Sequence, residues 1–388
     1  MTQPGTIYFD CNATTPLDPR VREAMLPFLG GVFGNPSSVH HIGRQARAFL
    51  DDARDRVAQV WQSKPSEVIF TSGGTESNNL AVFGAARLLR DKGRHLITSS
   101  VEHHAVLHCF HYLERREGFS VTYLPVNGEG LVSPDDLAMA IRPDTILVSI
   151  MAANNETGAI QPVAALGEIC RSRGVVFHTD AVQWFGKEHF EAIEQFNADL
   201  VSVCSHKFYG PKGAGALFMR SPLHLDPILF GGSHENERRA GTENLAAIAG
   251  FSGALTRFVK PPVFCSETLR PLIARLVERA TSLDGVVFRG SRQSRLANTV
   301  AFTVAGCDSI TLLAGLDLMG ICASSGSACS AGSLEPSHVL LAMGVEKRLA
   351  NSLVRFSLGR NSTLHEVETV ADVFLHIINR ARSCSGGL

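Results

Sequence analysis

The sequence predicts an α/β protein with a large domain built on a mostly parallel central sheet and a smaller α+β domain. Its length of 388 residues exceeds what one ordinary core can bury. From about residue 43 to 260, short apolar runs alternate with helical patterns, which is typical of a parallel sheet covered by helices on both faces. The pattern changes at "FVKPPV", residues 258–263. We therefore expect the large domain over residues 15–260 and the small domain over residues 1–14 and 261–388.

Several apolar runs of the large domain are expected to be strands. They are "EVIFTS" (67–72), "HLITSS" (95–100), "SVTYLPV" (120–126), "TILVSIMAA" (145–153), "VVFHTDA" (175–181) and "DLVSVCS" (199–205). The helical stretch before the first run, residues 43–60, places five apolar residues on one face: Ala46, Leu50, Ala53, Val57 and Val60. A further helix is predicted to begin at "SPDDLAMAI", with Ser133 as its N-cap and Asp136 near the capping-box position.

In the small domain, "NTVAFTV" (298–304) reads as a strand, and the N-terminal "TIYFDCNATTP" is expected to pack against this domain. Hydrophobic residues make up 45% of the chain and charged residues 19%, which indicates a folded protein. The formal net charge is -1, with no basic or acidic block. Nucleic acid and anionic membrane surfaces are therefore not expected as partners.

The N-terminal "MTQPGTIYFD" lacks the charged and apolar regions of a signal peptide, and the apolar runs fall far short of the ~20 residues that span a bilayer. The nine cysteines are scattered and form no Cys-x-x-Cys pair. This argues against a disulfide framework and a zinc ribbon. We expect a reducing, cytoplasmic location.

The first chemical motif is "FTSGGTESNN" (70–79), where a predicted strand runs through Gly73-Gly74-Thr75 into a helix. Glycines let main-chain N–H groups converge, Thr75 adds a hydroxyl donor, and the helix start adds positive potential. The motif predicts a phosphate seat, although an ordinary turn with an N-cap would use the same residues.

Two further motifs follow predicted strands. In "VVFHTDAVQ", Asp180 ends an apolar strand and needs a partner, which could be a buried arginine or a cationic ring nitrogen; Gln183 could donate to a ring oxygen. In "CSHKFYGPKGAGAL", Lys207 precedes a turn rich in glycine and proline. Burial would make it an amine nucleophile, and the alternative is a lysine that extends to the surface. A phosphate seat, a carboxylate and a lysine are what pyridoxal phosphate requires.

With these motifs the chain resembles the cysteine desulfurases of the NifS/IscS group, within the aminotransferase-like, fold type I pyridoxal-phosphate enzymes. The resemblance runs almost end to end. It is carried by "YFDCNATTPLDPRV", "FGNPSSVHHIGR", "FTSGGTESNN", "VEHHAVL", "ANNETGAIQP", "HTDAVQ", "HKFYGPKGAGAL", "RRAGTENLAAI", "SSGSACSAGSLEPSHVL" and "VRFSLGR".

The resemblance implies that Lys207 binds the cofactor's aldehyde covalently and that Asp180 and Gln183 contact its ring nitrogen and ring oxygen. His103 would stack on the ring and act as the acid/base histidine. The phosphate would be held by Gly74, Thr75, His206 and Ser205 and, from the neighbouring subunit of a homodimer, by Thr242. The substrate carboxylate would be held by Asn155 and Arg355, and a planar guanidinium suits such a bidentate contact.

"SSGSACSAG" (324–332) places Cys329 among small, turn-forming residues. In the family, the cysteine of this loop accepts sulfur from L-cysteine as a persulfide, and alanine is released. The resemblance also implies an iron–sulfur scaffold protein or another sulfur acceptor as partner, with Cys329 as a transient cluster ligand there. No other metal ligand is expected.

The chain departs from the family pattern at several positions. Cys11 replaces an asparagine, and Cys204 replaces a phosphate-binding serine whose contact we expect to be lost or shifted to Ser205, since a thiol is a poor donor. Asn236 and Glu237 stand where an arginine–glycine pair is frequent.

Competing interpretations remain. His104, His108 and His111 share a helical face close to Cys109 and could form a metal site. An aminotransferase or a selenocysteine lyase would use the same fold. A non-catalytic metal or iron–sulfur protein would instead use the scattered cysteines.

Overall fold

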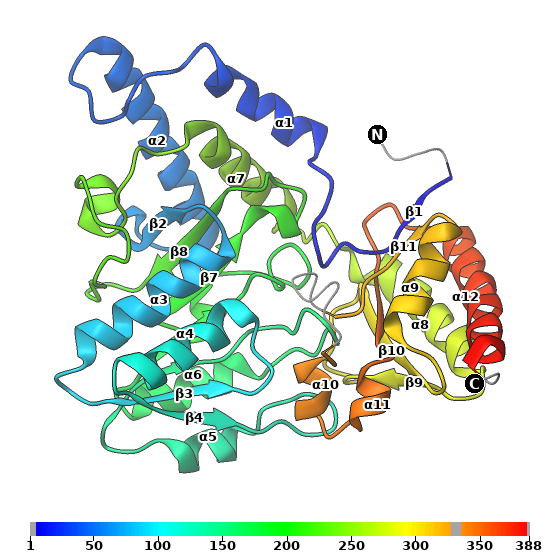
Figure 1. The fold of residues 1–388 in the computed structure, drawn as a ribbon. Coiled ribbons are helices and arrows are strands. Elements are labelled where there is room, and N and C mark those ends of the chain that lie inside the picture. Colours follow the sequence, from blue (N-terminus) through cyan, green and yellow to red (C-terminus); the bar gives the residue numbers. More distant parts are fainter. Residues whose placement is uncertain (1–4, 327–334, 386–388) are drawn as a thin grey trace.

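A computed structural model describes residues 5–326 and 335–385 of the chain, and Figure 1 shows their fold. The larger sheet has seven strands in the order β2-β8-β7-β6-β5-β3-β4. Their bounds are β2 (Val68–Thr71), β3 (His95–Ser99), β4 (Ser120–Leu124), β5 (Thr145–Ser149), β6 (Val176–Asp180), β7 (Leu200–Cys204) and β8 (Gly215–Met219). β8 runs antiparallel to β2 and β7 and the other neighbouring pairs are parallel, so the prediction of a mostly parallel sheet is confirmed.

All six predicted strands of the large sheet are present, whereas β8 was not predicted. Its segment was read only as the glycine-rich turn after Lys207, yet all its residues are buried. The short helical turn η4 (Ser205–Lys207) connects β7 to this region.

Helices cover both faces of this sheet. They are α2 (His41–Trp61), α3 (Gly74–Leu89), α4 (His104–Arg116), α5 (Pro134–Ala140), α6 (Val163–Ser172) and α7 (Leu245–Phe258), with α1 (Pro19–Met25) against α7. Ile69 and Phe70 are neighbours in β2, and their side chains belong to different apolar clusters. The cluster around Phe70 contains residues of α2, α6 and α7, and the cluster around Ile69 contains residues of α3 and α4. The sheet is therefore buried on both sides.

The two helix predictions are confirmed in detail. In α2, four of the five predicted apolar residues are buried and Val60 is half-buried. The side chain of Ser133 accepts a hydrogen bond from the main-chain N–H of Asp136, so Ser133 is the N-cap of α5.

The second part of the molecule contains an antiparallel sheet in the order β12-β10-β9. Its strands are β9 (Val286–Arg289), β10 (Thr299–Val304) and β12 (Val354–Ser357), and its helices are α8 (Ser266–Thr281), α9 (Ser309–Leu318), α10 (His338–Ala342), α11 (Lys347–Ala350) and α12 (Leu364–Ser385). The predicted strand "NTVAFTV" corresponds to β10. At the N-terminus, β1 (Ile7–Tyr8) pairs in parallel with β11 (Ile321–Cys322), and the chain then crosses to α1 (Figure 1).

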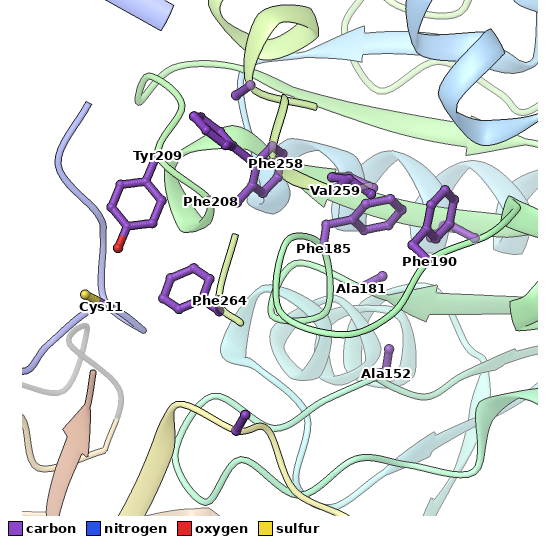
Figure 2. Packing of buried hydrophobic residues seen from close by; sticks show 14 of the residues in the cluster. Cys11, Ala152, Ala181, Phe185, Phe190, Phe208, Tyr209, Phe258, Val259 and Phe264 are labelled. Atoms are coloured by element: carbon purple, nitrogen blue, oxygen red, sulfur yellow. The ribbon is translucent and has the colours of Figure 1, made fainter. Parts of the chain in front are cut away.

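Aromatic residues that follow β6 and β7 pack together behind the edge of the sheet where these strands end, and Figure 2 shows this packing. The rings of Phe185 and Phe190 are 4.9 Å apart, and the rings of Tyr209 and Phe264 are 5.5 Å apart. Phe264 also donates its main-chain N–H to the carbonyl of Gly186. The turn after β6 is therefore held both by the packing of Phe185 on Phe190 and by the hydrogen bond between Gly186 and Phe264.

Within the described residues, no helix is both long enough and apolar enough to cross a membrane.

Candidate active site

A cavity of about 230 Å³ lies where several strands of the large sheet end. Its wall combines residues from the ends of the parallel strands with Asn12 and Ala13 of the N-terminal segment and Arg355 of β12. Nine of the residues expected at the site line it: Gly74, Thr75, His103, Asn155, Asp180, Gln183, His206, Lys207 and Arg355. The sequence motifs are therefore brought to one place, as expected for residues at the carboxyl edge of a parallel sheet.

The turn between β2 and α3 requires glycine. Gly73 has φ +151°, a conformation that other residues rarely adopt. A Cβ atom on Gly74 would lie 2.6 Å from Cγ2 of Val182, which is too close. The main chain therefore approaches the cavity at the first turn of α3, where free N–H groups attract an anion.

Asp180 ends β6 and is 5% exposed. The side chain of Asn78 donates to its Oδ2 at 2.6 Å, and the main-chain N–H of Val182 donates to its Oδ1 at 2.9 Å. Burial raises the pKa of this carboxyl group. Within the described part of the chain no arginine or lysine forms an ion pair with Asp180, so the interpretation as half of a buried arginine pair is wrong.

Lys207 extends into the cavity and not to the surface. Its Nζ donates to the main-chain oxygens of Asn12 and Ala13, both at 2.7 Å. Burial lowers the pKa of this amine below its usual value. A lower pKa increases the neutral fraction, which is the nucleophilic form.

Two histidines of the cavity wall are neutral at pH 7. His103 is the N-cap of α4, and its Nδ1 accepts from the main-chain N–H of Ala105 at 3.1 Å. Burial first, and then the charge of Lys207, lowers the pKa of His103 to about 4. The proton of this neutral ring is therefore on Nε2. His206 shares a hydrogen bond with Thr14, and burial lowers its pKa to about 3.

A family model described as aminotransferase class-V matches residues 7–370 of the chain. The chain belongs to this family.

Among relatives of this chain, the cysteine desulfurase IscS of Dictyoglomus turgidum is 47% identical over 98% of this chain and 96% of that protein. The IscS of Methanosarcina thermophila is 46% identical over 99% of this chain and 95% of its own. A solved NifS-like protein matches with TM-score 0.90 and 36% identity, over 97% of this chain and 100% of that one. The predicted fold type I and the membership of the NifS/IscS group are confirmed.

Enzymes of this family use pyridoxal phosphate, and the residues of the cavity fit that cofactor. The first turn of α3 offers N–H donors to a phosphate, Asp180 is a buried carboxyl group that forms no ion pair with any described residue, and Lys207 is an amine of lowered pKa. These groups share one cavity wall, so a single small molecule can reach all of them.

Arg355 is buried and lines the cavity. It donates to the main-chain oxygens of Asn155 at 2.8 Å and Gly326 at 2.6 Å, and it forms an ion pair with Asp10 at 2.6 Å. Its Nε has no hydrogen-bond partner within the described residues and is buried. An unused donor on a buried guanidinium suits a carboxylate ligand.

The structure corrects the prediction for Ser205. This residue is fully buried, does not line the cavity and donates its hydroxyl hydrogen toward the main-chain oxygens of Pro211 and Ala214. It stabilises the turn after Lys207 instead of replacing the phosphate contact. Cys204 does line the cavity, and burial raises the pKa of its thiol to about 11, so the thiol stays protonated.

Two other predicted residues lie elsewhere. Thr242 is exposed and lines a separate hollow with Glu235 and Arg239. Cys329 lies outside the described residues.

The histidine face of α4 forms a row of rings. His104 stacks on His108 at 4.9 Å and 10° between ring planes, and on His338 at 4.8 Å. No group of three or more His, Cys, Asp or Glu side chains in residues 5–326 and 335–385 is arranged to hold a metal ion. The metal-site interpretation of this face has no support in the described geometry.

Sequence reasoning missed Asn12, Asn78 and Lys187. Asn12 accepts from Lys207 through its main-chain oxygen and from Lys187 through Oδ1. The sequence held a signal for Asn12, because "DCNATT" places polar residues directly after an apolar run. This pattern does not indicate which distant strands these polar residues contact. Lys187 had no such signal.

Proposed function

We propose that this member of the class-V aminotransferase family is a pyridoxal-phosphate-dependent cysteine desulfurase, which converts L-cysteine to L-alanine and leaves the sulfur as a persulfide on Cys329. The observation that carries the proposal is the sharing of one cavity by Lys207, Asp180 and Arg355. Similarity to cysteine desulfurases over nearly the whole chain supports it. The segment with Cys329 follows Gly326, whose carbonyl contacts Arg355.

The cofactor would be held by its charged groups. The N–H groups at Gly74 and Thr75, together with His206, would bind the phosphate. Asp180 would pair with the ring nitrogen, Gln183 would donate to the ring oxygen, and His103 would cover the ring. When bound, the cofactor supplies an electron sink for bonds broken beside the substrate's amino group.

The chain's own residues divide the remaining tasks. Arg355 and Asn155 orient the substrate through its carboxylate. The neutral amine of Lys207 takes the proton from the substrate's Cα, which its lowered pKa permits near neutral pH. Neutral His103 carries its proton on Nε2 and is available as a donor.

The sulfur step is balanced without a further reactant. The Cys329 thiolate attacks the substrate sulfur, a sulfur–sulfur bond forms and the carbon–sulfur bond breaks. The substrate carbon keeps the electron pair, takes up a proton and leaves as alanine. The net change is cysteine plus thiol to alanine plus persulfide.

A homodimer is part of the proposal. The side chains of Phe33, Val39 and Phe230 are 73%, 87% and 83% exposed. Phe33 and Val39 precede α2 in the chain, and the segment that follows Phe230 contacts α2 through the ion pair of Glu235 with Arg54. Exposed apolar side chains of this size are frequent at interfaces between subunits. Thr242 lies in the same region and would reach the partner's phosphate. A solution mass near twice 41.8 kDa supports this assignment, and a monomer contradicts it.

The finer assignments complete the proposal. The persulfide would pass to an iron–sulfur scaffold protein or another sulfur acceptor, with no nucleic acid or membrane involved. The cysteines whose side chains are described are all free, which supports a reducing, cytoplasmic location. The domain limits 15–260 and 1–14 with 261–388 fit the separate sheets.

The experiment is incubation of the holoenzyme with L-cysteine, followed by measurement of alanine. We expect alanine from the wild type, and none from Cys329→Ala although its cofactor colour persists. Cys265→Ala removes an exposed, described cysteine and is the matched control. Full activity of Cys329→Ala would overturn the acceptor assignment. Keto-acid formation, or turnover restricted to selenocysteine, would instead indicate an aminotransferase or a selenocysteine lyase.

A further inference from the structure

Lys187 is a second buried amine near the cavity, and it has no role in the proposed reaction. It lies in the turn after β6 and is 1% exposed. Its Nζ donates to Oδ1 of Asn12 at 2.7 Å and to Oε1 of Gln183. No carboxylate in the described ranges forms an ion pair with it. Burying an amine without a counter-ion costs free energy, and the two hydrogen bonds of Nζ offset part of this cost.

Aromatic packing fixes where this amine lies. Nζ of Lys187 faces the ring of Phe264 at 5.4 Å. Figure 2 shows Phe264 at the edge of the aromatic core, near Tyr209 and Cys11. These apolar surroundings lower the pKa of Lys187 well below its usual value.

Lys187 decides which way the side-chain amide of Gln183 faces. Both partners of Nζ are oxygen atoms, and the amine keeps the N–H groups for these bonds whether or not it is charged. Gln183 accordingly turns Oε1 toward Lys187. Its Nε2 then donates one hydrogen to the main-chain oxygen of Asn12 at 2.9 Å. The second Nε2 hydrogen remains, and Gln183 lines the cavity.

In the opposite orientation Nε2 of Gln183 would face Nζ of Lys187, two donors if the amine is charged, and only the lone pair of an uncharged amine could accept from it. This orientation would also set Oε1 against the carbonyl oxygen of Asn12. Asn12 is itself held in place, because its Oδ1 also accepts a hydrogen bond from Nδ2 of Asn298 at 3.2 Å. Nδ2 of Asn12 donates to Oγ1 of Thr299 at 2.9 Å, so Asn12 cannot rotate to release Lys187 without losing these bonds.

We propose that Lys187 is a positioning residue that holds the amide of Gln183 with an N–H donor available to the ring oxygen of the cofactor. The inference rests on the proposed function, because the contact of Gln183 with the ring oxygen is assigned there. Its consequence is chemical: a donor at that oxygen favours the ionised form of the bound cofactor. The visible absorbance of the holoenzyme should therefore titrate at a lower pH with Lys187 than without it.

The test is a pH titration of cofactor absorbance in the Lys187→Met holoenzyme, since methionine fills a similar volume without a donor. We expect the midpoint to rise by about one pH unit, because a hydrogen bond to an ionised group changes its proton affinity about tenfold. Gln183→Met should give the same rise, and the double variant should give no more. An unchanged midpoint in folded Lys187→Met, or additive shifts in the double variant, would overturn the inference.

Lys260→Met is the matched control. Lys260 also donates to two main-chain oxygens, those of Val60 and Glu191, but it is exposed and away from the cavity. Its midpoint should equal that of the wild type. If Lys187→Met does not fold, the same titration is made on Lys187→Gln. The amide nitrogen of this glutamine ends one atom short of the position of Nζ and therefore does not reach Gln183. An upward shift supports the inference, and a wild-type midpoint overturns it.

The titration does not require turnover. A shifted midpoint in an enzyme that releases no alanine would sustain the role of Lys187 and overturn the desulfurase assignment. Alanine release with an unshifted midpoint would do the reverse.

Discussion

The Nη1 nitrogen of Arg355 donates to the main-chain oxygen of Gly326 at 2.6 Å. The same guanidinium lines the cavity and pairs with Asp10. Gly326 is the last described residue before the segment that contains Cys329. The group proposed to bind the substrate carboxylate is therefore in direct contact with the chain that leads to the proposed sulfur acceptor.

Arg355→Lys should raise KM for L-cysteine by about tenfold or more, because lysine keeps the charge but cannot bind a carboxylate with two parallel hydrogen bonds. Steady-state kinetics of alanine release measures this. Cofactor content should be unchanged, since the phosphate and ring contacts lie elsewhere. Arg22→Lys, on the surface, is the control. An unaltered KM would remove Arg355 from substrate binding.

Cys204→Ser should tighten cofactor binding about three- to tenfold. Cys204 lines the cavity with a protonated thiol, and a hydroxyl is a far better donor to phosphate. Dialysis against decreasing cofactor concentrations gives the dissociation constant. Cys109→Ser changes a buried thiol outside the cavity and should leave the constant unchanged. Equal or weaker binding in Cys204→Ser would show that this position does not face the phosphate.

Glu237→Gly should stabilise the protein by about 1 kcal/mol. Glu235, Asn236 and Glu237 all have positive φ, with +65° at Glu237, and this conformation suits glycine. Glu237 is exposed, so loss of its side chain removes little packing. Glu129→Gly, at an exposed position outside the left-handed region, should not stabilise. Urea unfolding measures both, and a less stable Glu237→Gly contradicts the strain argument.

Acid should weaken the fold through His178. This fully buried ring bonds Ser149 and Ser202, and burial lowers its pKa to about 3. An unfolded histidine takes up a proton near pH ~6.5. Below that pH the unfolded chain binds more protons than the folded one, so the free energy of unfolding falls. The loss is on the order of 1.4 kcal/mol per pH unit for this residue, until the folded ring titrates.

His178→Gln removes this dependence. The difference in unfolding free energy between wild type and variant should shrink as the pH falls from about 7 to about 5. His365→Gln, at an exposed site, serves as control. A difference that stays constant with pH would mean that His178 is not held neutral.

The sequence allowed the parallel strands and most of the cavity to be predicted. Asp180 and Lys207 each follow an apolar run, and the carboxyl edge of a parallel sheet gathers such residues. β8 was missed because glycines at its start resembled only a turn. Ser205 was misassigned because its neighbour Cys204 lines the cavity while its own hydroxyl is used by the following turn.

The contact between Lys187 and Asn12 could not be predicted from sequence patterns. The two residues are 175 positions apart. Which amide Lys187 meets depends on how the N-terminal segment closes over the sheet, and no local period or turn signal encodes that contact. Thr242 raises a similar difficulty, since its expected partner belongs to another chain.

The most direct measurement is borohydride reduction of the holoenzyme followed by peptide mass analysis. The two buried amines of this region, Lys207 and Lys187, give it an internal comparison. The account predicts that the pyridoxyl mass resides on the peptide with Lys207 and that Lys187 is unmodified. A cofactor fixed to Lys187, or a Lys207 peptide of unaltered mass in active enzyme, would contradict it.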